Sequence, residues 1–151
     1  MCSAGTRFDQ RLVLKHTMST STPNPAELGT LAQHQAQLSQ GQFQIQKCQT
    51  CSRHIYFPRE ICPHCGSDEV AFVTPSGLGT VYAVTTVRRK PAEGGDYNVS
   101  LIDLDEGPRL MSRVSDCPPE AVHIDQRVKA HVVVTEGRGV VMFTALNGVA
   151  A

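Results

Sequence analysis

Residues 48–65 read CQTCSRHIYFPREICPHC, and this stretch decides the fold of the chain around it. It contains two Cys-x-x-Cys pairs, Cys48 with Cys51 and Cys62 with Cys65. Two such pairs can bring four thiolates into one tetrahedron, the geometry that Zn²⁺ prefers in closed structural sites. Since sulfur would fill all four positions, none is left for water or substrate. The sequence therefore predicts one structural zinc ion and argues against catalysis by the metal.

The same four cysteines have two alternative interpretations. They could form a disulfide framework, or they could hold iron, as the four sulfurs of a rubredoxin do. A disulfide framework suits an exported protein, but the N-terminal sequence has no signal-peptide core, because Leu12-Val13-Leu14 is short and is followed by Lys15. We therefore expect a cytoplasmic protein with reduced thiols and with zinc as the metal. Met1 and Met18 are both candidate start residues.

The charge and the hydropathy of the chain argue against two classes of function. The 151 residues include 14 basic and 14 acidic side chains, so the net charge is zero when histidine is neutral. Domains that bind duplex nucleic acid are usually strongly basic, so we expect no nucleic-acid partner of that kind. No apolar run approaches the roughly 20 residues that a transmembrane helix needs, so we expect no membrane span.

The composition changes along the chain and predicts four segments. The first is a polar tail rich in Ser, Thr and Pro. Ala, Leu and Gln then favour a helix that ends at Gly41 and carries Leu28, Leu31 and Leu38 on one face. This narrow apolar face suits packing on a neighbour or on another subunit. The expected segments are a disordered tail over 1–25, a helix over 26–41, a zinc ribbon over 42–69 and a barrel over 70–151.

After Gly66 the sequence is typical of a β protein. Segments rich in β-branched residues are separated by Gly-rich turns, and no helical crossover lies between them. Short, closely spaced strands of this kind predict a small closed barrel. We expect a turn of helix within residues 118–126, in the connection between the two hairpins. The expected strands are 42–47 in the ribbon and 70–74, 79–87, 97–104, 109–114, 128–135 and 140–146 in the barrel.

Three stretches of the chain share their order and spacing with one known family: Phe57–Ser67 (FPREICPHCGS), Ser76–Tyr82 (SGLGTVY) and Leu101–Gly107 (LIDLDEG). They resemble the acyl-CoA-associated zinc-ribbon/OB-fold proteins, and the resemblance extends over about residues 27–147. It implies a mainly β protein with an N-terminal helix, a rubredoxin-like zinc ribbon and a C-terminal OB-fold barrel. It also places the zinc ligands of the family on the four cysteines of the two Cys-x-x-Cys pairs.

The resemblance implies a function as well. Members of this family are partners of thiolase-type enzymes, whose own subunits carry the catalytic cysteine and histidine. They occur in acyl-CoA metabolism, in sterol side-chain breakdown and in aromatic polyketide tailoring. We therefore expect a non-catalytic scaffold subunit that bridges a thiolase-like subunit and a ketosynthase-like subunit of an acyltransferase complex. The isolated chain is not expected to be an enzyme, and acyl-CoA is a candidate ligand at the interface.

A basic cluster formed by Arg88, Arg89 and Lys90 is the main candidate for contact with a small molecule. It could bind the phosphates of an acyl-CoA. The alternative, which we favour, is a solvated loop or the rim of a protein interface. OB-fold barrels also bind single-stranded nucleic acid by stacking bases on aromatic side chains. This chain has no tryptophan and few aromatic residues in the barrel. A free-standing module that binds acyl-CoA or single-stranded nucleic acid is therefore the alternative function.

The other reactive side chains are expected to have no chemical role. Cys117 lacks a neighbouring base, and Asp116 beside it should raise the pKa of its thiol. His64 lies between two predicted ligands and cannot easily reach the same ion. His123 and His131 fall near strand ends, with no Ser or Cys partner visible in the sequence.

Overall fold

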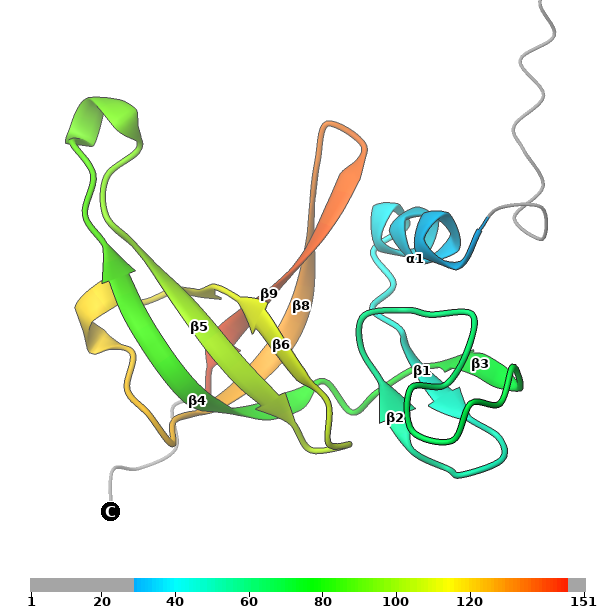
Figure 1. Ribbon diagram of the computed structural model, residues 1–151. Helices are drawn as coiled ribbons and strands as arrows, with labels where there is room; N and C mark the ends of the chain where they lie inside the picture. Colours follow the sequence, from blue (N-terminus) through cyan, green and yellow to red (C-terminus); the bar gives the residue numbers. More distant parts are fainter. Residues whose placement is uncertain (1–28, 147–151) are drawn as a thin grey trace, which may run out of the picture.

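The computed structural model describes residues 29–146, and within this range the chain is mainly β, as predicted. One α-helix, α1 (Thr30–Ser39), precedes a three-stranded sheet and a six-stranded sheet (Figure 1). The predicted tail over 1–25 lies outside the described residues. Among the described residues, no helix is long and apolar enough to cross a membrane.

The three-stranded sheet is the ribbon that carries the cysteines. Its central strand, β1 (Ile45–Cys48), pairs antiparallel with β2 (His54–Ile55) and with β3 (Val70–Val73). We expected residues 70–74 to begin the barrel, but β3 pairs along its whole length with β1 and completes the ribbon. The ribbon sheet therefore extends beyond residue 69. How the chain divides into domains stays a prediction.

The six-stranded sheet forms the barrel. Its strands are β4 (Leu78–Val87), β5 (Tyr97–Leu104), β6 (Arg109–Ser112), β7 (Val114–Ser115), β8 (Arg127–Thr135) and β9 (Arg138–Ala145), and 3₁₀ turns lie at Pro91–Glu93 and Pro119–Ala121. The order in the sheet is β6-β5-β4-β8-β9-β7. Because β7 follows β6 directly along the chain and pairs in parallel with β9, the two edges of the sheet meet (Figure 1). The predicted strand 109–114 is thus divided into β6 and β7.

A buried asparagine joins β5 to β7 where the barrel closes. Asn98 is 2% exposed, and its Nδ2 donates to the carbonyl oxygen of Val114 at 2.7 Å. Its Oδ1 accepts the N–H of Val114 at 2.9 Å and the hydroxyl of Ser100 at 3.1 Å. Backbone polar groups that are buried without a partner are costly, so this side chain stabilises a strand of only two residues.

One apolar core joins the helix, the ribbon and the barrel. Val81, Ile102 and Phe143 fill the barrel and are fully buried. Leu38 from α1 and Ile45 from β1 belong to the same cluster of buried side chains. Burying a side chain of this size contributes about 1.5–3 kcal/mol. The shared core therefore stabilises the position of the helix and of the ribbon against the barrel.

Helix α1 ends where the sequence predicts, but its buried face differs from the prediction. Gly41 has a φ of +78°, in the left-handed region that glycine favours, and its N–H donates to the carbonyl oxygen of Leu38 at 2.9 Å. His34 and Leu38 are buried, whereas Leu31 is 64% exposed and Leu28 lies outside the described residues. Leu31 is on the same face as His34, but the first turn of the helix lies over a groove instead of over the core.

The helix crosses β9 at a glycine. A Cβ atom placed on Gly139 would lie 2.0 Å from the carbonyl oxygen of Leu38, a distance that no side chain can tolerate. The close approach also lets the Nε2 of Gln35 donate to the carbonyl oxygen of Gly139 at 3.1 Å. Gly139 is therefore required for the contact between α1 and the barrel.

Replacing Gly139 with alanine tests this contact. We expect Gly139→Ala to lower the free energy of unfolding by about 1–3 kcal/mol, the usual cost of overpacking, and to speed hydrogen exchange in α1. Chemical denaturation and exchange mass spectrometry measure the two effects. Gly29→Ala is the control, because nothing lies within 4 Å of the Cβ it would add. Unchanged exchange in the α1 of Gly139→Ala would contradict the close approach.

Candidate functional site

The four cysteines of the ribbon meet at one point. All four Sγ atoms lie within 4.8 Å of one another, with Cys48 Sγ 3.6 Å from Cys65 Sγ and Cys51 Sγ 3.7 Å from Cys62 Sγ. A tetrahedral zinc ion with Zn–S bonds of about 2.3 Å separates its sulfurs by about 3.8 Å. The donor set and its spacing therefore fit the zinc that the sequence predicts.

Backbone N–H groups point at two of the sulfurs. The N–H of Cys51 donates to Cys48 Sγ at 3.5 Å, and the N–H of His64 donates to Cys62 Sγ at 3.4 Å. Such hydrogen bonds favour the charged form of a thiol. Several hydrogen bonds to its sulfur, that of the Cys51 N–H being the largest contribution, together lower the pKa of the Cys48 thiol to about 6. Since a metal binds the thiolate, this arrangement prepares Cys48 for coordination.

The ribbon has little apolar material of its own around the sulfurs. Cys48, Cys62 and Ile55 form its buried cluster, and Val70 and Cys51 pack against them half-buried. A sheet this small cannot be stabilised by so few apolar contacts, and a structural metal commonly supplies the deficit. The observed ribbon thus has the composition of a metal-dependent fold.

His64 lies outside the sulfur cluster. Its side chain is exposed, and its Nδ1 lies 3.3 Å from Nη1 of Arg53. Among the described residues, the group whose atoms could share one metal ion consists of the four cysteines alone. His123 is exposed as well, and His131 lies on β8 opposite Met142.

The basic cluster does not act as one unit. Arg88 donates from Nη1 to Asp96 Oδ2 at 2.6 Å and also to Glu120 Oε1. These partners raise the pKa of Arg88, and the hydrogen bond from Arg88 lowers the pKa of Asp96. The charge of Arg88 is thus compensated within the chain. The guanidinium of Arg89 instead lies 5.2 Å from the centre of the Tyr97 ring, and Lys90 is exposed.

A further arginine, which sequence reasoning missed, contacts the same tyrosine. The guanidinium of Arg113 lies 4.2 Å from the centre of the Tyr97 ring. Among the described residues, neither Arg89 nor Arg113 forms an ion pair. Arg113 follows β6 by one residue, far from Arg89 in the sequence, and the pairing of β5 with both β4 and β6 brings the two arginines to the same ring. These two guanidiniums are better placed to bind an anion than Arg88 is.

Cys117 packs against the barrel core and is half-buried. Its burial raises the pKa of the thiol, and the charge of Asp116 raises it further. The direction agrees with the sequence-based expectation. A thiol with a raised pKa is a weaker nucleophile at neutral pH, because less of it is ionised.

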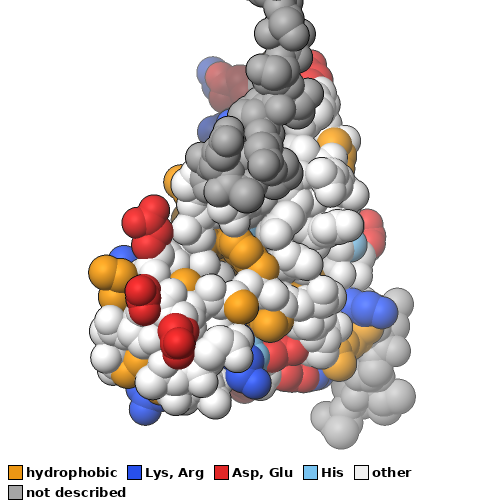
Figure 2. All heavy atoms as spheres, turned by 90° about the vertical axis from the view of Figure 1, so that its right-hand side faces the viewer, with side chains coloured by type: hydrophobic (Ala, Val, Ile, Leu, Met, Phe, Trp, Pro, Cys, Tyr) orange, Lys and Arg blue, Asp and Glu red, His pale blue; other side chains and the backbone are white. Residues whose placement is uncertain are grey.

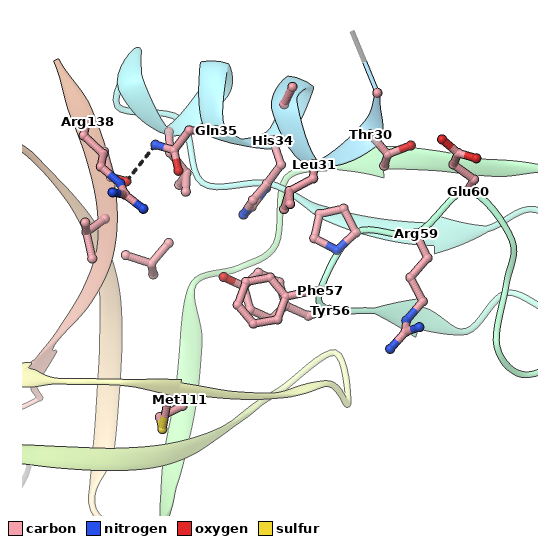
Figure 3. Close-up of a pocket in the computed structure, with 17 residues that line it drawn as sticks. Thr30, Leu31, His34, Gln35, Tyr56, Phe57, Arg59, Glu60, Met111 and Arg138 are labelled. Atoms are coloured by element: carbon pink, nitrogen blue, oxygen red, sulfur yellow. Dashed lines mark hydrogen bonds between the residues drawn. The ribbon is translucent and has the colours of Figure 1, made fainter.

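A groove of about 920 Å³ lies where the helix, the ribbon and the barrel meet. Figure 2 shows a face of the molecule on which hydrophobic side chains gather near the centre, among polar ones. Figure 3 shows the lining of the groove, with α1, the ribbon segment 56–60 and strands of the barrel around it. Four large apolar side chains of the lining are more than half exposed: Leu31 (64%), Phe57 (58%), Met111 (68%) and Val140 (51%).

A second groove of about 430 Å³ continues the first. It shares Met111 and Val140 with the first groove and adds Val133 and Met142 from the barrel, with Arg113 in its lining. Sequence reasoning missed this apolar surface. The available signal was adjacent apolar pairs such as Leu110-Met111 and Val140-Val141, since one member of each pair must point out of the barrel.

The floor of the first groove holds a buried histidine. His34 is 2% exposed, and its ring packs edge-on against Tyr56 at 5.6 Å and in a stacked arrangement with Phe72 at 6.3 Å. Both ring nitrogens lack a hydrogen-bond partner among the described residues. Burial lowers the pKa of His34, which favours the neutral imidazole.

Two family profiles match adjoining stretches of the chain. Residues 36–71 match the profile described as the ChsH2 rubredoxin-like zinc ribbon domain. Residues 72–133 match the profile described as the ChsH2 C-terminal OB-fold domain. The two matches follow one another without a gap, in the order that the structure has.

Curated proteins are similar to about half of the chain. A DUF35 domain-containing scaffold protein of Methanocaldococcus jannaschii is 37% identical over 89 residues, which cover 56% of this chain and 62% of that protein. A DUF35 domain-containing scaffold protein of Pyrococcus furiosus is 36% identical over 80 residues, covering 50% of this chain and 57% of that protein. A probable enoyl-CoA hydratase alpha subunit of Thermomonospora curvata is 33% identical over 86 residues, covering 56% and 27%. In each case the match spans less than two thirds of the relative's own length.

Two solved structures resemble the chain more completely. One is described as an Ltp2-ChsH2(DUF35) aldolase: it is 26% identical, with a TM-score of 0.69, and the match covers 81% of this chain and 98% of that one. The other, a DUF35 family protein of unknown function from Sulfolobus solfataricus, has a TM-score of 0.55 at 18% identity and covers 76% and 84%. The second likeness concerns the fold alone. Together with the profiles, they confirm the predicted succession of zinc ribbon and OB-fold.

Elemental analysis of the reduced, folded protein tests the metal. We expect one zinc ion per chain in the wild type. In Cys62→Ser we expect loss of most of the zinc, because the ion loses one of its four thiolate ligands. We also expect the ribbon to unfold, because its small apolar cluster cannot stabilise it without the metal. Cys117→Ser is the matched control and should keep its zinc. Metal-free wild type that is reduced and folded would contradict the assignment, and iron in place of zinc would favour the rubredoxin alternative.

Proposed function

The chain belongs to the ChsH2 (DUF35) family of zinc-ribbon and OB-fold proteins, and from this premise we propose that it is a non-catalytic scaffold subunit of a multicomponent acyltransferase. In this role it binds partner subunits and holds them in a fixed relative position. The reacting cysteine and histidine lie on a partner.

The observation that carries this proposal is the exposed apolar surface of the first groove. Leu31 comes from the helix, Phe57 from the ribbon, and Met111 and Val140 from the barrel. Large contiguous apolar patches are uncommon on monomers and usually mark surfaces where another molecule binds. A surface to which all three parts contribute suits a protein whose function is to position others.

The metal has a structural role in this proposal. Cys48, Cys51, Cys62 and Cys65 hold one zinc ion, and sulfur completes its coordination, so no substrate reaches it. The ion keeps the ribbon folded and thereby keeps residues 56–60 in place beside the groove. Zinc binding requires reduced cysteines, and the cytoplasm, where we expect this protein, keeps thiols reduced.

The finer part of the proposal concerns the partners and the reaction. We place a thiolase-like subunit and a ketosynthase-like subunit on either side of the scaffold. The reaction is a C-acylation that transfers acetyl groups, and its acceptors are phloroglucinol-type aromatic compounds in polyketide antibiotic biosynthesis. The sequence motifs support this assignment. Its general form agrees with the names of two relatives, a DUF35 domain-containing scaffold protein and a probable enoyl-CoA hydratase alpha subunit.

A second candidate function rests on Arg89 and Arg113. Two guanidiniums on one tyrosine, without carboxylate partners among the described residues, can bind a phosphate or carboxylate. The adjoining apolar groove with Val133 and Met142 suits an acyl chain. Acyl-CoA binding by the free chain is therefore the alternative to a pure scaffold, and single-stranded nucleic acid is the other ligand of this chemistry.

Affinity purification of the tagged chain from its native host tests the scaffold. We expect a thiolase-like protein to copurify in fixed stoichiometry, and acyl transfer to require the partner's cysteine and not Cys117. Size-exclusion chromatography and subunit mass spectrometry measure the composition. Recovery of the chain as a lone monomer from cells that express a thiolase-like protein would refute the proposal.

Calorimetry distinguishes the ligands of the second candidate. If Arg89 and Arg113 bind an acyl-CoA, we expect binding of a coenzyme A thioester that weakens at least tenfold in Arg113→Ala, with the loss of one charge-assisted contact worth about 1.5–3 kcal/mol. Arg88→Ala is the control, since its charge is already compensated. Tight binding of a single-stranded oligonucleotide that weakens steeply with salt would indicate the nucleic-acid alternative instead.

A further inference from the structure

We propose that the groove between α1, residues 56–60 and β9 receives an apolar segment of the partner subunit that is flanked by carboxylates, which pair with Arg59 and Arg138. This inference rests on the proposed scaffold function and names the chemistry of the segment that binds. It follows from the walls and the rims of the groove, which come from different parts of the chain.

The walls of the groove require an apolar occupant. Leu31, Phe57, Met111 and Val140 expose most of their side chains here, and each comes from a different element or loop. The removal of such surface from water is favourable in proportion to its area. The groove is also continuous with the second groove through Met111 and Val140, so the occupant can extend along the barrel.

The rims of the groove carry uncompensated positive charge. Arg59 and Arg138 are exposed, and among the described residues neither forms an ion pair. Figure 3 shows the two side chains on opposite sides of the groove, Arg138 on the barrel side and Arg59 on the ribbon side. The lining contains a single carboxylate, that of Glu60. Carboxylates before and after the apolar part of the occupant complement this arrangement.

The charges argue against a second copy of this chain as the occupant. In a dimer with twofold symmetry, the same surface of each copy faces the other. Arg59 and Arg138 of one copy would then approach the same two arginines of its mate, with one glutamate per groove to compensate them. A segment of opposite charge on a different protein meets no such repulsion.

The test uses the wild-type complex and purified partner subunit from the native host. We expect Arg59→Glu combined with Arg138→Glu to weaken partner binding at least tenfold and to remove most of its salt dependence. Lys129→Glu is the charge control, because this exposed residue lies outside the groove. Lysine substitutions of the partner's flanking carboxylates should restore binding to the double variant.

Two further variants test the walls. Val140→Asp should abolish binding, whereas Ile124→Asp, at an apolar side chain that is 60% exposed outside the groove, should not. Thermal unfolding checks the fold of each variant.

A photo-crosslinker at Met111 identifies the occupant directly. We expect it to capture a partner peptide with apolar residues between Asp or Glu residues. Capture of residues 1–28 of this chain, of a second copy, or of a partner peptide without acidic residues would overturn the inference, as would wild-type affinity in the double arginine variant. If these results occur while the partner still copurifies with the wild type, the scaffold function stands and the inference about the groove is wrong. Failure of any partner to copurify would refute both.

Discussion

The contact between α1 and β9 at Gly139 is the constraint on which the arrangement of the three parts depends. With no side chain at Gly139, the helix backbone reaches the barrel, and Leu38 enters the barrel core. One turn earlier, His34 packs between Tyr56 and Phe72 of the ribbon. The same short helix therefore contacts both sheets. Without it, the ribbon would be joined to the barrel through Ile45, the half-buried side chains Phe43, Tyr56 and Val73 that pack on the same core, and the connection after β3.

The arrangement of the three parts also depends on the ribbon, and the fold of the ribbon depends on the sulfur cluster. Its apolar core is too small to hold the long connection between β2 and the second Cys-x-x-Cys pair. Gln46, which is buried in β1, accepts the N–H of Arg59 at 2.7 Å and fixes this connection to the sheet. A metal that orders β1 and the second pair thus also orders the segment that carries Phe57 and Arg59. In this way a site with no open coordination position can influence what binds some distance away.

The sequence was informative where the signals are local. The two Cys-x-x-Cys pairs, the strand Tyr97–Leu104 and the helix end at Gly41 follow from spacing, alternation and glycine geometry, and each is found as predicted. Contacts between distant residues are what the sequence does not show. Arg88 adjoins Arg89 and Lys90 in the sequence, but Glu120, far along the chain, helps to neutralise its charge. Nothing in the sequence of β3 shows that its partner is β1. The groove cannot be inferred from the sequence for the same reason, since its walls come from four separate segments.

The surface of the barrel also distinguishes a nucleic-acid partner from a protein partner. Nucleic-acid-binding OB-folds present several aromatic side chains along a basic groove. Here Phe143 is buried in the core, and the arginine that stacks on Tyr82 is Arg109, whose charge is paired with Asp103. Tyr97 is then a single aromatic side chain with unpaired arginines beside it. One ring cannot stack several successive bases of a single-stranded nucleic acid. The larger apolar surface lies at the junction with the helix and the ribbon. A molecule bound there contacts all three parts at once, so its affinity depends on their relative position and, through the ribbon, on the metal.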